Sequence, residues 1–242
     1  MPDLAPVALV TGAAHGLGHE VARRLAARGF DVIVTARDPA AAAAAADRLG
    51  AGVSGLPVGL DIADPAGVRA AAEALTDRPG RLDVLVHNAA AYVDWTETAT
   101  GADLDAAHAV LETNLFGAWR LTQALLPLLR RSPAGRIVNI SSGAGSHDDP
   151  AFGLRARHGA AASYGISKAA LNALTTTLAT ELADTPILIN AVCPGLTATW
   201  PGAEAMGARP VGDSAGGIVW AATLPAGGPS GGFFRDTSPL PW

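Results

Sequence analysis

The chain has 242 residues, of which 49% are hydrophobic and 16% are charged, so it is long enough to bury a sizeable core. Its formal net charge of −5 excludes the basic surface with which proteins bind nucleic acids or anionic membranes. The single cysteine, Cys193, excludes an internal disulfide and zinc sites built from paired cysteines. We therefore predict one globular domain over residues 1–242, with no nucleic-acid partner and no membrane partner.

The N-terminal sequence MPDLAPVALVTGAA differs from a signal peptide, because no Lys or Arg precedes its short apolar run. No stretch of the chain reaches the roughly 18 apolar residues that a membrane span requires. Together with the lone cysteine, these features predict a cytoplasmic protein.

Apolar, β-branched runs alternate with helical patterns along the chain. Residues 7–11 predict a buried strand, which is followed by a glycine-rich turn and a helix that ends near Gly29. Residues 31–36 predict the next strand, and residues 39–50 begin with proline and end with glycine, as helices often do. Further strands are predicted at 56–60, 82–88, 136–141 and 187–192. This alternation predicts a parallel sheet covered on both faces, which is a doubly wound α/β fold.

Two segments interrupt the alternation. Residues 143–162 contain glycine, proline, mixed charge and two histidines without a clear period, which predicts an insertion. Residues 199–214 are similarly irregular and predict a short substrate loop. Both segments follow predicted strands, so we expect them at the carboxyl edge of the sheet, where such sheets bind ligands. Residues 231–242 predict a short strand and a proline-rich tail.

The sequence TGAAHGLG, residues 11–18, forms the turn between the first strand and the first helix. Glycines allow such a turn to approach a pyrophosphate closely, and the helix N-terminus offers free amides and the positive end of its dipole. The spacing differs from GxGxxG, so a turn that uses glycine only for its shape is the alternative. His15 would add positive charge when protonated, although a solvated surface histidine fits equally well.

The end of the second predicted strand carries the signal for cofactor choice. An acidic residue commonly binds the ribose of NAD at this point, whereas an arginine accommodates the 2′-phosphate of NADP. The strand ends with Ala36 and Arg37, and the guanidinium can pair with a phosphate through two hydrogen bonds. The sequence therefore favours NADP(H) over NAD(H), with the neighbouring Asp38 as a competing signal.

Lys168 is the only lysine of the chain, and Tyr164, one of two tyrosines, precedes it by four residues. On a helix, positions i and i+4 share a face, so the phenol and the ammonium would point into the same space. Lysine is a compact ammonium on a flexible stem, which can contact two hydroxyls and change a neighbour's pKa. The pair is a candidate for acid/base chemistry, and coincidence is the alternative.

Together these motifs resemble the short-chain dehydrogenase/reductase family over essentially the whole chain. TGAAHGLG is similar to the family's glycine motif, residues 87–90 (HNAA) to its Asn-Asn-Ala-Gly segment, and residues 194–199 (PGLTAT) to its Pro-Gly segment. The resemblance implies a Rossmann-type fold that binds NADP(H). It implies cofactor contacts from Thr11, Gly12, His15, Gly16, Leu17, Gly18, Arg37, Asp61, Ile62, Asn88, Ala89, Tyr164, Lys168, Pro194, Gly195, Thr197 and Thr199.

The resemblance also implies four catalytic residues, Asn114, Ser142, Tyr164 and Lys168. Lys168 is expected to lower the pKa of Tyr164 from its reference value of about 10 and to hold the nicotinamide ribose. Ser142 is expected to bind the substrate carbonyl oxygen, and Tyr164 to deliver the proton. Asn114 is expected to position a water beside Lys168.

The sequence departs from the family pattern at two places. His87 and Ala90 replace the first Asn and the final Gly of the Asn-Asn-Ala-Gly segment, and we expect His87 to be structural rather than catalytic. Twenty-one residues lie between Ser142 and Tyr164, more than is usual for the family. This insertion, with the GGFFRD and PW endings, resembles the carbonyl-reductase-like branch. In some members such an insertion obstructs the dimer helices, so both a monomer and a homo-oligomer are open.

Two further groups of side chains have alternative interpretations. Four residues of the insertion are of metal-ligating type but follow no regular spacing, which favours a solvated loop and predicts no metal site: His147, Asp148, Asp149 and His158. Three aromatic residues are candidates to line a substrate pocket, with ordinary packing as the alternative: Trp95, Phe152 and Trp200.

The resemblance implies an NADPH-dependent oxidoreductase that reduces a ketone or an aldehyde to an alcohol reversibly, with tyrosine as general acid and base. The alternative within enzymes is a tailoring ketoreductase that acts on one secondary metabolite. A sensor that binds NADP(H) without turnover is a third hypothesis, but such a protein has little reason to retain all four catalytic residues.

Overall fold

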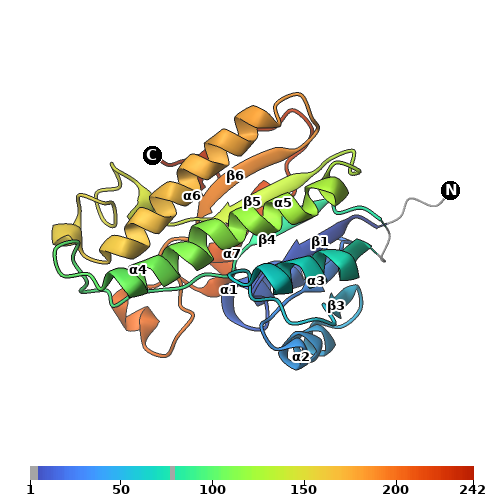
Figure 1. Ribbon diagram of the computed structural model, residues 1–242, viewed down its shortest axis with the longest axis horizontal. Coiled ribbons are helices and arrows are strands. Elements are labelled where there is room, and N and C mark those ends of the chain that lie inside the picture. The colour runs from blue at the N-terminus through green and yellow to red at the C-terminus, as the bar shows by residue number, and fades with distance from the viewer. Residues whose placement is uncertain (1–4, 77–79) are drawn as a thin grey trace.

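The strands of the protein form one sheet with helices on both sides (Figure 1). The computed structural model describes residues 5–76 and 80–242. The predicted absence of a signal peptide concerns residues 1–14, of which the first four lie outside the described residues. Within the described residues the sheet has eight strands in the order β3-β2-β1-β4-β5-β6-β7-β8. The strands are β1 Val7–Val10, β2 Asp31–Val34, β3 Val53–Gly55, β4 Val84–His87, β5 Arg136–Ile140, β6 Leu188–Cys193, β7 Phe233–Arg235 and β8 Ser238–Pro239.

The sheet is parallel from β3 to β7, and β8 alone among the described strands runs antiparallel to its neighbour, β7. The helices are α1 Gly16–Ala26, α2 Pro39–Leu49, α3 Pro65–Thr76, α4 Leu104–Leu111, α5 Ala118–Leu129, α6 Ala162–Glu181 and α7 Val211–Ala222. A π-helical turn, η1 Glu112–Gly117, joins α4 to α5.

Alternate residues of each central strand point to opposite faces of the sheet, and both faces are buried. In β1, Leu9 packs in the core beneath α3, α5 and α6, whereas Val10 packs in the core beneath α1, α2 and α7. The helices of the first group lie in front of the sheet in Figure 1. This arrangement confirms the predicted doubly wound α/β fold.

The predicted strand at residues 56–60 is wrong, because β3 ends at Gly55. Pro57 has no N–H with which to continue a ladder. The amides of Leu56 and Leu60 still donate to β2 and to the residues after it, at 2.9 Å each, so the segment follows the sheet edge without strand geometry. Its apolar residues are buried against α3 and α5 instead.

The second irregular segment is shorter than predicted, because α7 begins at Val211 rather than after residue 214. It contains a 3-10 turn, Ala203–Met206, and an isolated bridge between Thr197 and Arg209. The insertion is irregular as expected and contains two 3-10 turns, Gly143–Gly145 and Arg157–Gly159. Both segments follow the carboxyl ends of central strands.

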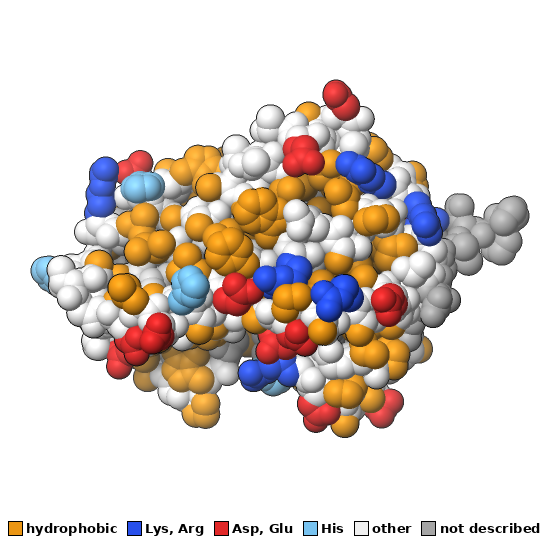
Figure 2. Space-filling view, in the orientation of Figure 1, with side chains coloured by type: hydrophobic (Ala, Val, Ile, Leu, Met, Phe, Trp, Pro, Cys, Tyr) orange, Lys and Arg blue, Asp and Glu red, His pale blue; other side chains and the backbone are white. Residues whose placement is uncertain are grey.

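Hydrophobic side chains gather across the middle of the face shown in Figure 2, over α5 and α6. The large hydrophobic residues that η1, α5 and α6 expose are Phe116, Trp119 and Ile166. None of the helices in the described part of the chain is long and apolar enough to cross a membrane.

Candidate active site

The order of the strands places a switch point at the carboxyl ends of β1 and β4, where open α/β sheets have their ligand crevice. The chain proceeds from β1 outward to β3 and then returns to β4 on the other side of β1, so the connections after β1 and β4 diverge. Open α/β sheets bind ligands at such a switch point. The glycine-rich turn follows β1, and the segment His87–Ala90 closes the other side.

The glycine-rich turn is fitted closely against the end of β4. Gly12 and Gly16 each have a φ of +61°, a conformation that favours glycine. A Cβ at Gly18 would stand 2.5 Å from Asn88 Nδ2. That amide nitrogen donates to the carbonyls of Thr11 (2.8 Å) and Gly12 (3.0 Å), so Asn88 clamps the turn. The predicted motif residues therefore form one rigid unit.

The segment after β6 folds back over this turn. Gly195 has a φ of +74° and redirects the chain after Pro194. The side chain of Thr199 then lies beside Gly16, with Cγ2 3.6 Å from the position of a Cβ at that glycine. The buried Thr197 holds the segment, since its Oγ1 lies 2.9 Å from Ser214 Oγ on α7. Two motifs predicted from distant parts of the sequence therefore meet.

The residues after β2, Arg37 and Asp38, have different surroundings. Asp38 caps α2 by accepting a hydrogen bond of 2.9 Å from the amide of Ala40, so one of its oxygens is engaged. Arg37 is exposed, and its side chain makes no hydrogen bond or ion pair within the described residues. A second arginine, Arg48, reaches the glycine-rich turn and donates 2.9 Å to Ala14 O. Sequence reasoning missed Arg48, which lies in the alanine-rich helix.

Other predicted cofactor residues lie around the same crevice. His15 precedes α1 and is exposed, and its side chain makes no capping hydrogen bond. Asp61 is exposed and accepts a hydrogen bond of 3.0 Å from the amide of Ala63. Ile62 is buried, and a Cβ at Gly117 would stand 2.8 Å from its side chain. Of these residues, Asp61 and His15 offer exposed polar side chains.

Tyr164, Lys168 and Ser142 meet at the carboxyl end of β5. Tyr164 and Lys168 occupy successive turns of α6, as predicted, and Lys168 Nζ lies 5.6 Å from the centroid of the Tyr164 ring. Ser142 follows β5 and lies close enough to Tyr164 for its hydroxyl to lower the pKa of the phenol. Both α6 residues are buried, Tyr164 to 7% exposure and Lys168 to 3%. A phenol, a hydroxyl and an ammonium are therefore adjacent.

The electrostatics of this group differ from the sequence-based expectation. Burial raises the pKa of Tyr164, the nearby Tyr92 raises it further, and the hydroxyl of Ser142 opposes them. Lys168 is not among the groups that lower it, and its Nζ donates 2.9 Å to the carbonyl of Ile140. Burial also lowers the pKa of Lys168 itself to about 8. The protein alone thus keeps Tyr164 protonated, which suits a proton donor.

Asn114 lies in the π-helical turn η1 and is buried. Its Oδ1 accepts 2.7 Å from the amide of Ala91, and its Nδ2 donates to Ala91 O and to Ser167 Oγ at 2.9 Å and 3.0 Å. Both polar atoms of the side chain therefore have partners. In the protein alone, this side chain connects the loop after β4 to α6.

A row of buried hydrogen bonds connects the sheet to the helices beneath the site. Ser141 donates 2.6 Å to Asn172 of α6, and His87 Nε2 lies 2.9 Å from Thr122 Oγ1 of α5. Thr122 donates its own hydrogen to the carbonyl of Ala118, so His87 carries its proton on Nε2. Burial lowers the pKa of His87 to about 3, with a smaller effect of Lys168. This neutral imidazole has the structural setting that we predicted.

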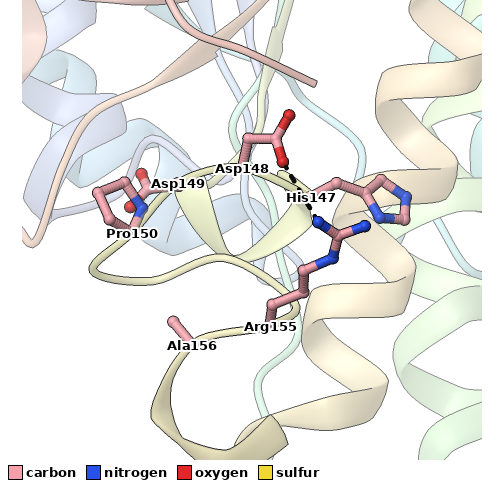
Figure 3. A pocket seen from close by; sticks show the side chains of 6 residues that line it. All are labelled: His147, Asp148, Asp149, Pro150, Arg155 and Ala156. Carbon is pink, nitrogen blue, oxygen red and sulfur yellow. Dashed lines mark ion pairs between the residues drawn. The ribbon is translucent and has the colours of Figure 1, made fainter.

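The insertion is anchored to the C-terminal strand. Asp149 is buried, pairs with Arg235 of β7, and accepts hydrogen bonds from the amides of Ala151 and Phe152. Burial raises the pKa of Asp149, but the guanidinium of Arg235 and the two backbone hydrogen bonds that Asp149 accepts lower it, and the net effect is a lowered pKa. The insertion also forms a surface pocket of about 240 Å³, in which Asp148 Oδ1 lies 3.7 Å from Arg155 (Figure 3).

This surface pocket contains none of the four predicted catalytic residues Asn114, Ser142, Tyr164 and Lys168, which we call the tetrad. It is lined by His147, Asp148, Asp149, Pro150, Arg155 and Ala156. In the described ranges no three His, Cys, Asp or Glu side chains are grouped closely enough to hold a metal ion. Asp148 and Asp149 instead pair with arginines.

Aromatic residues surround the ring of Tyr164. Tyr92 stacks on it with a centroid separation of 5.4 Å, and Trp95 approaches it edge-on at the same separation. Of the three predicted pocket residues, only Trp95 has a ring contact with Tyr164 within the described residues; Phe152 and Trp200 have none. Sequence reasoning missed Tyr92, whose only available signal was its place four residues after Asn88.

The comparison with known proteins agrees with this geometry. The sequence model of the family described as short chain dehydrogenase matches residues 6–206. A rhamnolipids biosynthesis 3-oxoacyl-(acyl-carrier-protein) reductase from Pseudomonas aeruginosa is 36% identical over 193 residues, which are 78% of this chain and 72% of that protein. A granaticin polyketide synthase putative ketoacyl reductase 2 from Streptomyces violaceoruber is 38% identical over 204 residues, 81% of this chain and 74% of that protein.

The fold also matches solved structures. The crystal structure of NADPH-bound carbonyl reductase from chicken fatty liver superimposes with a TM-score of 0.82 and 28% sequence identity, covering 99% of each chain. The family match spans most of the chain, and the relatives exceed 30% identity over more than two thirds of its length. The protein therefore belongs to the short-chain dehydrogenase family and is an oxidoreductase.

Proposed function

We propose that the protein is an NADP(H)-dependent oxidoreductase that reduces a ketone or an aldehyde to an alcohol, and that the reaction is reversible. The observation that supports this most strongly is the buried group of Ser142, Tyr164 and Lys168 at the carboxyl edge of the sheet. A hydroxyl beside a protonated phenol is suited to bind a carbonyl oxygen, and the phenol is suited to donate a proton to it.

The residues around the crevice fit a dinucleotide. The glycine-rich turn has two positive-φ glycines and no side-chain cap at α1, so its backbone amides can bind a pyrophosphate. Thr199 lies over Gly16, where it can contact a nicotinamide placed between the turn and the tetrad. When bound, NADPH would supply the hydride. Lys168 would turn its ammonium toward the ribose hydroxyls.

Arg37 determines the preference for NADP(H) in this proposal. Its guanidinium is exposed after β2, whereas the competing carboxylate of Asp38 is engaged as the cap of α2. A guanidinium binds a 2′-phosphate through two charged hydrogen bonds. The carbonyl reductase from chicken fatty liver was solved with NADPH bound, which is consistent with this assignment.

Each of the tetrad residues Ser142, Tyr164 and Asn114 has a different role in the proposed reaction. Ser142 donates a hydrogen bond to the carbonyl oxygen as negative charge develops there. Tyr164 gives its proton to the same oxygen, and its raised pKa keeps that proton available at neutral pH. Asn114 acts as a positioning residue, because its side chain holds Ala91 and Ser167 beside the site.

The substrate class has two candidates within this reaction. A general carbonyl reductase is the leading one, and it rests on the insertion between Ser142 and Tyr164 and on the likeness to carbonyl reductase. A tailoring ketoreductase for one secondary metabolite is the second, because the granaticin relative is named as a ketoacyl reductase. A sensor without turnover is less consistent with a fully assembled tetrad.

The direct test measures NADPH oxidation by absorbance across a panel of aldehydes, ketones and quinones, with NADH in parallel. We expect turnover of at least one class of carbonyl and a preference for NADPH. NADPH binding without oxidation on every carbonyl would favour the sensor. Turnover that is faster with NADH would contradict the assignment of Arg37.

A further inference from the structure

The loop between β4 and α4 places two aromatic side chains against the catalytic tyrosine. The rings of Tyr92 and Tyr164 are nearly parallel, at 21°, with centroids 5.4 Å apart. Trp95 meets Tyr164 at 72°, and its ring lies 6.0 Å from that of Tyr92. The three rings therefore form one aromatic cluster, whose innermost member is the proton donor.

Hydrogen bonds fix this loop at both ends to elements of the tetrad. Before Tyr92, the backbone of Ala91 is held by the side chain of Asn114 at 2.7 Å and 2.9 Å. After Trp95, one carboxylate oxygen of Glu97 accepts from the amide and the hydroxyl of Ser163, at 2.8 Å and 2.6 Å. Ser163 directly precedes Tyr164 on α6. The two aromatic residues are thus held at a set position relative to the reacting phenol.

The cluster is not a buried packing core. Tyr164 is only 7% exposed, whereas Tyr92 and Trp95 are 63% and 41% exposed. Large aromatic surfaces therefore remain open to solvent directly beside the reacting group. Aromatic rings interact with other rings in stacked or edge-on arrangements beyond the area that they bury. A flat aromatic molecule would gain such contacts here, whereas a flexible alkyl chain would gain only area and lose rotational freedom.

We propose that Tyr92 and Trp95 form a specificity clamp that selects planar, ring-conjugated ketones over flexible aliphatic 3-oxoacyl chains. This inference rests on the proposed reductase function and names its substrate class. In this arrangement the aromatic part of the substrate lies against the exposed surfaces of Tyr92 and Trp95. Its carbonyl oxygen then faces the hydroxyls of Ser142 and Tyr164.

The test compares one planar ketone, 1-indanone, with one flexible ketone, ethyl 3-oxohexanoate. We expect Tyr92→Leu and Trp95→Leu each to lower kcat/KM for 1-indanone about three- to tenfold, which corresponds to the loss of one aromatic pair. The value for the flexible ketone should change less than about twofold. The difference in intrinsic reactivity between the two ketones cancels, because the kcat/KM of each ketone with a variant is divided by its kcat/KM with the unmodified protein.

Three variants serve as controls. Tyr92→Phe and Trp95→Phe keep a ring at each position and should retain the preference for 1-indanone. Trp119→Leu removes from α5 a tryptophan of similar exposure, 39%, which has no ring contact with the cluster within the described residues, and should affect neither substrate. If the leucine variants lowered kcat/KM equally for both ketones, or left the ratio of the two kcat/KM values unchanged, the clamp would be overturned.

A binding measurement keeps this inference separate from the proposed function. Calorimetric titration of both ketones into the NADPH complex of Tyr164→Phe measures affinity without turnover, and this variant keeps the central ring. We expect tighter binding of 1-indanone, which Trp95→Leu in the same background should reduce about three- to tenfold. Equal affinities of the two ketones would overturn the clamp. Absence of NADPH oxidation by the unmodified protein would instead overturn the reductase function.

Discussion

The two sides of the crevice present different chemical groups, backbone on one side and side chains on the other. On the side of β1, the glycine-rich turn presents backbone, and its shape depends on glycines at 12, 16 and 18 and on the clamp from Asn88. On the side of α6, the site presents side chains, namely Ser142, Tyr164 and the aromatic residues of the loop after β4. The first side is suited to a ligand of constant structure, and the second to a variable one.

This difference has a chemical reason. Backbone amides at a helix N-terminus bind any pyrophosphate in the same way, so the turn requires a short motif and little else. Substrate recognition depends on the shape and polarity of side chains, which loops can change without altering the scaffold. If each side performs only its own task, a substitution on one side should leave the task of the other side unchanged.

The largest effect is expected from Ser142→Ala on the side-chain half of the site. Loss of a donor to the developing oxyanion should lower kcat about 100- to 1,000-fold, while the Kd of NADPH changes less than twofold. Steady-state kinetics and a fluorescence titration measure the two quantities. Ser141→Ala is the matched control: it removes the hydrogen bond to Asn172 and should lower the free energy of unfolding by about 1 kcal/mol with little change in kcat.

The next largest effect concerns the backbone half. Gly18→Ala places a Cβ 2.5 Å from Asn88 Nδ2 and 3.1 Å from the backbone of Ala13. We expect NADPH affinity to fall at least about tenfold and the free energy of unfolding to fall by about 1–3 kcal/mol. Thermal or urea unfolding and cofactor titration check these values.

Gly216→Ala is the control for this substitution. Gly216 also lies in a helix, but a Cβ there meets no atom within 4 Å. Its replacement should raise the free energy of unfolding by about 0.5–1 kcal/mol and leave NADPH binding unchanged. If both glycine variants behaved alike, close packing of the turn would not explain the motif.

Arg37→Ala tests the charged side chain that we place at the 2′-phosphate of the cofactor. Loss of a charged pair with the 2′-phosphate should weaken NADPH binding about 10- to 100-fold and leave NADH binding nearly unchanged. Arg48→Ala removes an arginine that holds Ala14 O and should affect both cofactors equally. An equal loss for both cofactors in Arg37→Ala would assign the preference to other groups.

The smallest effect concerns Lys168, which serves both halves. Because burial lowers its pKa to about 8, the ammonium is present at pH 7 and is lost as the pH rises above that value. NADPH binding should therefore weaken several-fold between pH 7 and pH 9. Lys168→Arg keeps its charge over this range and should remove the pH dependence, even if turnover falls. A flat profile in the unmodified protein would argue against a role for the ammonium in binding.

The sequence was sufficient to predict most of the fold and the glycine-rich turn between β1 and α1. Periodicity located the buried strands, and the motif of glycines marked the turn, because both reflect constraints that act within a few residues. The prediction was wrong at residues 56–60, where an apolar run around Pro57 packs against helices without forming a strand. Periodicity alone does not distinguish a buried strand from an irregular apolar segment that packs against helices.

The side-chain half was predicted only in part. The spacing of Tyr164 and Lys168 on a helix was evident, but their environment was not. Burial and the nearby Tyr92 raise the pKa of Tyr164, and the ammonium of Lys168 donates a hydrogen bond to the carbonyl of Ile140. Tyr92 was missed because its contact with Tyr164 joins residues that are distant in the sequence. Such contacts depend on the tertiary fold.

The most direct test of the account measures two quantities on the same preparation of Tyr164→Phe: NADPH oxidation with a reactive ketone and the Kd of NADPH. The substitution removes the phenol hydroxyl and keeps the ring that contacts Tyr92 and Trp95. We predict that turnover falls about 100- to 10,000-fold while the Kd stays within about threefold of the unmodified protein. Turnover within about threefold of the unmodified protein would contradict the assignment of Tyr164 as the proton donor.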